Sequence, residues 1–263
     1  MRRLTQVTRA AAGALLLLTS VSNLAAQQLT TRAPETDSKS STWQGGRGTY
    51  LKAFVVDDRL SALRREPDLR SEVVRRLRLG RTVFIVGASN PKTGQPRFCR
   101  VAVTRRTRGW LHPAALAVQG RGGEDQRMMR LIENASDGLD RILLCRILIE
   151  RFSQSQLVPR ALLLLGEEAE RAAETLSQRA RKRLAEVRGG TGSARLSEYY
   201  LNDAGLDRYS KLRVVFDFNE FIAEYVYDGV AYRDIVRRFP QGEEARLARQ
   251  RLEFATQKMA RRQ

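Results

Sequence analysis

The side chains with the most distinctive chemistry in this sequence are one histidine, His112, and two cysteines, Cys99 and Cys145. A cysteine nucleophile needs a neighbouring base, but Cys145 lies within the apolar run Ile142 to Ile149, so we expect it to be a buried thiol. Cys99 falls in an alternating strand pattern and is expected to face an interior. Two cysteines and one histidine exclude a four-cysteine zinc site and most multi-histidine metal centres. We therefore expect no catalytic residue, no metal and no cofactor.

A second candidate chemistry comes from aromatic and acidic residues near the C-terminal end. Ten of the 18 aromatic residues lie between Tyr199 and Phe239, and residues 198–228 hold seven acids against three bases. Aromatic faces with carboxylates suit sugar binding, and a carboxylate pair can hydrolyse a glycosidic bond. A cell-wall glycosidase that uses carboxylates of residues 198–239 is therefore the alternative function. The interpretation we favour is that the large aromatics form the core of a helical hairpin: Phe216, Phe218, Phe221 and Tyr225.

Positive charge is concentrated in one part of the chain. The formal net charge is +18, and residues 47–121 alone hold 17 basic against 5 acidic side chains. This concentration predicts contact with an anionic polymer or a membrane surface, and nucleic acid would match the charge as well. The competing interpretation is coding bias, because the chain has 41 arginines and only 6 lysines. The candidate binding residues are Tyr50, Trp110, Arg105, Arg106 and Arg108, the three arginines crowding a turn before Gly109.

The first 26 residues have the three parts of a secretory signal peptide. Arg2, Arg3 and Arg9 make a basic start, an uncharged apolar run follows, and Leu24-Ala25-Ala26 offers small residues for cleavage. The apolar run is shorter than the roughly 20 residues that a membrane-spanning helix needs. We expect a periplasmic or secreted protein with no transmembrane span after cleavage. Since an exported protein rarely meets nucleic acid, we expect no nucleic-acid partner.

The rest of the chain divides by composition. Residues 27–46 are rich in Thr, Ser, Gln and Gly, which is typical of a flexible linker. Short β-branched runs separated by turn residues fill 47–121 and predict a small β-barrel. After the glycines of 120–123, residues 122–263 follow a mostly helical pattern. Strands are expected at 49–56, 81–86 and 98–103, and helices at 157–188 and from about Glu243.

The β-rich segment resembles the bacterial SH3-like domain. The similarity lies in Leu63 to Pro67, in the glycine turn Leu77 to Gly80 with its following strand, and in the ending Gly109-Trp110-Leu111. The resemblance covers about 70 residues and implies a small barrel that binds a cell-wall component or a protein. In eukaryotic SH3 domains a proline and a tyrosine that help to bind polyproline follow this ending. His112 and Ala115 occupy those places here, which argues against polyproline recognition.

The helical segment contains a repeated turn that resembles tetratricopeptide-type repeats. Phe152 and Phe239 each follow an arginine in a Phe-x-Gln turn, and an alanine comes nine positions later, at Ala161 and Ala248. An alanine at that point lets two helices approach closely. The two turns lie 87 residues apart, whereas a regular repeat has about 34. The pattern therefore predicts degenerate helical hairpins.

These observations combine into one expectation of fold and function. The fold class is multi-domain α+β, with a small SH3-like β-barrel at 47–121 followed by an all-α tetratricopeptide-like domain at 122–263. The function expected is non-enzymatic binding or scaffolding at the cell envelope. The partner is a cell-wall or other anionic envelope component, or a protein.

The leader gives the first testable prediction. N-terminal sequencing of protein from the envelope fraction should find a mature terminus near Gln27, because the small residues before it fit a signal-peptidase site. Protein that retains Met1 in the cytoplasm would contradict the export assignment.

The glycines at 120–123 give the second prediction. Limited proteolysis should cut there and leave two stable fragments, because an exposed glycine-rich connection yields easily to proteases. Loss of both halves in a single step would show that they form one cooperative unit.

Overall fold

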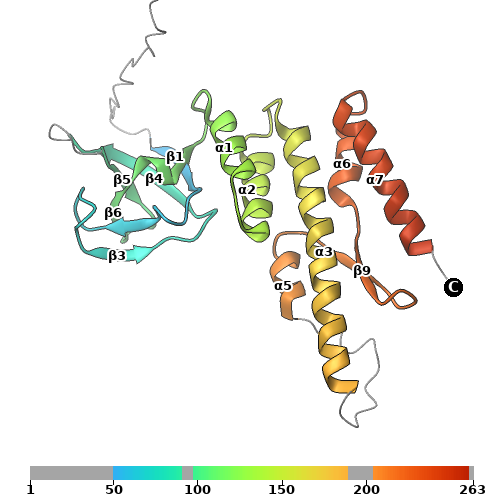
Figure 1. Cartoon of the computed structure of the whole chain (residues 1–263). Helices are drawn as coiled ribbons and strands as arrows, with labels where there is room; N and C mark the ends of the chain where they lie inside the picture. Colours follow the sequence, from blue (N-terminus) through green and yellow to red (C-terminus); the bar gives the residue numbers. More distant parts are fainter. Residues whose placement is uncertain (1–49, 91–96, 189–203, 261–263) are drawn as a thin grey trace, which may run out of the picture. The chain divides into compact units, whose positions relative to one another are not determined.

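The alternating runs of the first half form a seven-stranded antiparallel sheet in the computed structural model, which describes residues 50–90, 97–188 and 204–260 (Figure 1). The strands follow the order β3-β2-β6-β5-β4-β1-β7 across the sheet. Their bounds are β1 (Leu51–Val55), β2 (Ala62–Arg64), β3 (Val73–Arg76), β4 (Thr82–Ala88), β5 (Cys99–Ala102), β6 (Arg108–Leu111) and β7 (Leu116–Val118).

The three strands expected from the sequence are confirmed as β1, β4 and β5. Strands β3 and β7 stand at the two edges, and no pairing closes them into a barrel within the described residues. A short 3₁₀ helix, η1 (Pro113–Ala115), links β6 to β7. The architecture that the structure shows is a mixed α+β arrangement of an antiparallel sheet and helices.

Strand β1 contributes to two different cores because successive side chains of a strand point to opposite faces. Ala53 and Val55 belong to the interior of the sheet, which contains apolar side chains from most of the strands. Phe54, together with Val56 just after the strand and Ala117 of β7, belongs to the core formed by the helices. The sheet and the helices are therefore joined through the outer face of β1 and β7.

Six helices are described, and the two long ones were expected. They are α1 (Glu124–Glu133), α2 (Gly138–Arg151), α3 (Val158–Arg188), α5 (Ala204–Ser210), α6 (Val230–Arg238) and α7 (Glu243–Ala260). The apolar stripe of α3 is buried against α2, α6 and strand β9 (Glu224–Tyr227). None of these helices is both long and apolar enough to span a membrane.

The aromatic segment is a β-hairpin, so the expected helical hairpin is wrong. Strand β8 (Phe216–Asn219) pairs antiparallel with β9. The sequence alternates aromatic and polar side chains in Phe216-Asp217-Phe218, and this period of two fits a strand and not a helix. Aromatic residues also pack well on a pleated surface, so the hairpin buries Tyr225 against α3 at 1% exposure.

The repeated turn links a helix to a helix in both places. Phe152 ends α2 and Phe239 ends α6, and in each case the amide of the phenylalanine donates to the carbonyl four residues earlier. Ala161 of α3 and Ala248 of α7 are completely buried where the next helix packs. A small side chain at these positions allows the close approach of two helices that the sequence predicted.

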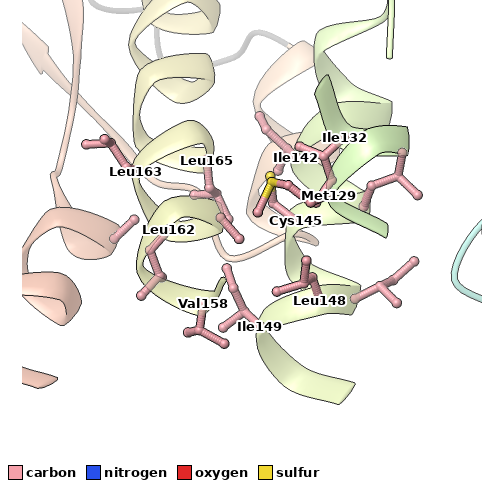
Figure 2. Close-up of a cluster of buried hydrophobic side chains, with 14 of the residues drawn as sticks. Met129, Ile132, Ile142, Cys145, Leu148, Ile149, Val158, Leu162, Leu163 and Leu165 are labelled. Atoms are coloured by element: carbon pink, nitrogen blue, oxygen red, sulfur yellow. The ribbon is translucent and has the colours of Figure 1, made fainter. Parts of the chain in front are cut away.

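Leucine, isoleucine and alanine side chains of α1, α2 and α3 form the centre of the helical core. Figure 2 shows Met129 and Ile132 of α1 near Ile142 and Cys145 of α2, while Leu162 and Leu165 of α3 approach from the other side. One glycine marks a tight place in this part. A Cβ atom built on Gly166 would lie 2.6 Å from Cζ of the buried Tyr232 ring of α6.

This contact gives a stability prediction. Gly166→Ala should lower the free energy of unfolding by about 1–3 kcal/mol, because the methyl group displaces the Tyr232 ring and outweighs the higher helix propensity of alanine. Denaturant unfolding followed by circular dichroism measures the loss. Gly122→Ala is the matched control, since nothing lies within 4 Å of a Cβ there, and it should change stability by less than about 0.5 kcal/mol. Equal stability of the two variants would contradict the close packing of α3 on α6.

Candidate functional site

The seven strands of the sheet carry basic side chains and no acidic ones. Their six cations are Lys52, Arg64, Arg75, Arg76, Arg100 and Arg108. The acidic residues of this half lie in the connecting loops, as Asp57 and Glu72 do. Since the inner face is apolar, the charges of β1, β2, β5 and β6 point outward.

The outward positions of three neighbouring strands place a tryptophan between two arginines. Trp110 of β6 lies directly opposite Arg64 of β2 on one side and Arg100 of β5 on the other. Side chains of directly paired residues lie on the same face about 5 Å apart. Arg64 is held in position, because its Nη1 donates to the carbonyl of Ser71 at 2.7 Å.

The same face continues with an aromatic and a cation on the next two strands. Phe84 of β4 lies opposite Lys52 of β1 on one side and opposite Ala102 of β5 on the other. Ala102 is two residues along β5 from Arg100. Ala102, which lies opposite Phe84, and Gly87, which lies opposite Arg100, are both small. Neither Phe84 nor Arg100 is therefore covered by the small residue opposite it. Phe84 is 43% exposed, which is high for a phenylalanine in a strand. We call these five residues, Arg64, Trp110, Arg100, Phe84 and Lys52, the cation–aromatic track.

The candidate residues expected from the sequence gather around this track. Arg108 lies two positions before Trp110 on the same strand face. Tyr50, 65% exposed, lies two positions before Lys52. Arg105 and Arg106 are exposed in the turn between β5 and β6, where Thr104 Oγ1 accepts from the amides of Arg106 and Thr107.

Sequence reasoning missed Phe84, Arg100, Arg64 and Lys52. Arg64, Arg100 and Lys52 occupy outward positions of strands, so the alternation of apolar and polar residues could have placed them on the solvent side. Phe84 lies in the continuous apolar run Val83-Phe84-Ile85-Val86, which carries no such signal. That they lie beside Trp110 depends on the order of the strands, which places β2, β6, β5, β4 and β1 next to one another.

The cations of the sheet differ in their electrostatic surroundings from those of the helices. In the described part of the chain, six sheet and turn arginines form no ion pair: Arg75, Arg76, Arg100, Arg105, Arg106 and Arg108. Helical arginines are commonly neutralised, and Arg141 and Arg171 share the carboxylate of Glu168 at 2.8 and 2.7 Å. The field of the sheet cations is therefore not cancelled by local carboxylates.

The carboxylates of the alternative hydrolytic function lie elsewhere, in a groove of about 440 Å³ between α3, β9 and α7. Glu224 of β9 pairs with Lys258 at 2.6 Å and with Arg181 at 3.0 Å, and the hydrogen bond from Lys258 is the main reason that its pKa is lowered. Glu170 of α3 pairs with Arg251 at 3.2 Å, while burial raises its pKa. These pairs connect the three elements that form the groove.

The cysteines and the histidine lie apart in separate environments. Cys99 is buried in the sheet interior, Cys145 in the helical core, and both are free thiols. His112 caps η1, with Nδ1 accepting from the amide of Ala114 at 3.2 Å, and its ring contacts Phe98 edge-on. Within the described residues, no group of three His, Cys, Asp or Glu side chains is arranged to hold a metal.

Comparison with known proteins identifies no relative of this chain. No protein-family model matches it, and no curated protein and no solved structure shows significant similarity to it.

The buried thiols give a prediction of reactivity. Burial raises the pKa of the Cys99 thiol, and it raises that of Cys145 to about 12. At pH 8 a thiol with that pKa is ionised to roughly 1 part in 10⁴, and only the thiolate reacts. A colorimetric thiol reagent should therefore detect almost no free thiol in the native protein and two per chain after denaturation. Rapid modification of the native protein, assigned with Cys99→Ser and Cys145→Ser, would contradict the burial of that thiol.

Proposed function

We propose that this protein is an exported, non-enzymatic binding or scaffold protein of the cell envelope. Its sheet contacts an anionic polymer of the envelope through the outer face that carries the cation–aromatic track. Its helical part mediates contacts with proteins. The single observation that carries the proposal is a face with exposed aromatics and unpaired cations, and with no carboxylate on any of the seven strands.

The charge arrangement supports binding over coding bias. Coding bias would raise the arginine content of both halves alike, yet many helical arginines pair with carboxylates, whereas in the described residues the strand arginines Arg75, Arg76, Arg100 and Arg108 form no ion pair and the pairs of this half lie in its loops. An uncompensated cluster of cations attracts polyanions over about 10 Å at 0.1 M salt. Exposed aromatic side chains add apolar contact to this attraction.

The proposal also assigns folds to the sheet and to the helical part. The sheet is proposed to be a variant of the bacterial SH3-like domain, and the helices to be degenerate tetratricopeptide-like hairpins. The turns at Phe152 and Phe239, each followed by a fully buried alanine, support the helical assignment. Ala115 is buried and His112 caps η1, so neither offers the side chain that a polyproline ligand would contact.

The alternative, a cell-wall glycosidase, has weaker support. Glu170 and Glu224 do line one groove with the exposed Phe254, as a sugar site would require. Each carboxylate is already engaged by a cation from a neighbouring element. Such pairs stabilise the packing of α3, β9 and α7 without any substrate.

The proposal predicts binding that depends on salt and on the turn arginines. The full chain should bind dextran sulfate at about 50 mM salt and lose most of its affinity by about 150 mM, because exposed charges are screened. Arg105→Ala, Arg106→Ala and Arg108→Ala combined should weaken binding roughly tenfold, since each exposed contact contributes up to about 1 kcal/mol. Isothermal titration calorimetry measures both effects.

A matched variant controls for total charge. Arg160→Ala, Arg179→Ala and Lys182→Ala combined remove the same charge from exposed positions of α3 and should leave binding within about twofold, because they lie on the helical part. Equal losses from both triple variants would show that net charge alone acts. Absence of binding at low salt would refute the proposed function.

A further inference from the structure

The cation–aromatic track crosses five neighbouring strands, and it steps by two residues between Arg100 and Phe84, because Phe84 lies opposite Ala102 and not opposite Arg100. Taken in the order of the strands β2, β6, β5, β4 and β1, its residues are Arg64, Trp110, Arg100, Phe84 and Lys52. Every cation is therefore followed by an aromatic ring on the next strand. The line runs across the strands, and it uses one side chain from each.

The spacing of strands sets the repeat of this line. Neighbouring strands lie about 4.8 Å apart, so Arg64 and Arg100, which are in register on either side of Trp110, stand about 10 Å apart. Lys52 lies two strands beyond Arg100 and is also displaced by two residues along the strands, with Phe84 between them. A polymer that matches the line must present an anionic group and then an uncharged ring, in series along its own backbone, with the same repeat.

Common polyanions differ in how charges and rings are placed along their backbones. A polyphosphate offers charge at every unit and has no ring for Trp110 or Phe84. In a nucleic acid the phosphates form one line and the bases project from it as side groups, so rings and charges run side by side and not in series. In a polysaccharide the rings are part of the backbone. Each sugar of an extended chain advances it by about the distance between two neighbouring strands of a sheet.

We propose that the ligand of this face is an acidic polysaccharide in which a carboxylate-bearing sugar alternates with an uncharged sugar. The inference rests on the proposed function and assigns the ligand class of the same face. The carboxylates lie over Arg64, Arg100 and Lys52, and the uncharged rings lie on Trp110 and Phe84. Arginine favours this arrangement, because its planar guanidinium binds a carboxylate through two hydrogen bonds.

Two features of the sheet favour the binding of such a chain. Gly87 and Ala102 are the β4 and β5 residues paired with Arg100 and Phe84, and their small size keeps the middle of the line open. Arg64 is held by Ser71, so binding orders one long side chain fewer. The three residues in register, Arg64, Trp110 and Arg100, correspond to three consecutive sugars, two of them acidic, and Phe84 and Lys52 extend the site obliquely.

Tryptophan fluorescence of the full chain can report on this site directly. The sequence has two tryptophans, Trp43 and Trp110, so Trp43→Phe leaves Trp110 as the only emitter. The probes are hyaluronan oligosaccharides, in which every second sugar is acidic, and polygalacturonate oligosaccharides of equal length, in which every sugar is acidic. Neutral chitin oligosaccharides, polyphosphate and oligothymidylate complete the panel.

At about 150 mM salt, where simple charge attraction is screened, hyaluronan should change the Trp110 emission and bind at least about tenfold more tightly than the other probes. Phe84→Ala and Arg100→Ala should each reduce this affinity roughly tenfold. Phe84→Leu, which keeps apolar bulk in the strand, should also lose most of the affinity if the ring itself is the platform. Phe254→Ala removes another exposed aromatic, from α7, and should have no effect.

The outcomes separate this inference from the proposed function. Binding of polygalacturonate or polyphosphate as tight as that of hyaluronan would overturn the alternating-glycan assignment and leave anionic-polymer binding intact. Tighter binding of oligothymidylate, with a larger change in emission, would make the face a nucleic-acid site. If no probe binds even at about 50 mM salt, both proposals fail.

Discussion

The structure depends on the double burial of strand β1. Because alternate side chains of a strand point to opposite faces, Ala53 and Val55 complete the interior of the sheet while Phe54 and Val56 enter the helical core. Each large buried apolar side chain contributes about 1.5–3 kcal/mol, so one five-residue strand stabilises both parts of the molecule. Lys52 Nζ and the Arg151 guanidinium lie over the ring of Phe54 at the margin of this contact.

This arrangement also decides which part of the sheet is open. Helical residues cover the outer face at Phe54 and Ala117, so β1 and β7 are largely buried on both sides. Farther along the sheet the outer face is exposed at Phe84, Arg100 and Arg108. A sheet that is covered along one edge and open along the other presents a bounded surface. The cation–aromatic track lies on it from Arg64 to Phe84, with Lys52 at its margin beside Phe54.

Helix α3 has the corresponding role among the helices. Its alanines and Gly166 allow α2, α6 and β9 to approach closely, and Tyr232 packs its ring against Gly166. Glu168, nearly buried, joins α2 to α3 by accepting from Arg141 and Arg171. In the helical part these arginines and carboxylates pair with one another between and along helices. The strand arginines Arg100 and Arg108, in contrast, form no ion pair in the described residues and are available to a ligand.

The sequence by itself determined strands β1, β4 and β5, the long helix α3, the helix from Glu243 and the two helix–turn–helix links, because each depends on local periodicity or a local turn. It also located the basic half and five candidate binding residues, since composition and a crowded turn are visible without a fold. The aromatic hairpin differs from the expectation, because burial of large aromatics suits a helical hairpin and a β-hairpin alike, and only the period-two pattern of Phe216-Asp217-Phe218 indicates strands.

Only the tertiary structure decided how those residues combine. The sheet order places β6 between β2 and β5, which brings Arg64 beside Trp110 although 46 positions separate them in the chain. It likewise brings Lys52 beside Phe84 and assigns Phe54 to the helical core. Local sequence specifies which face of a strand a side chain occupies. Which strand lies next to it depends on long-range burial and hydrogen bonding, and a pattern read along the chain does not contain that information.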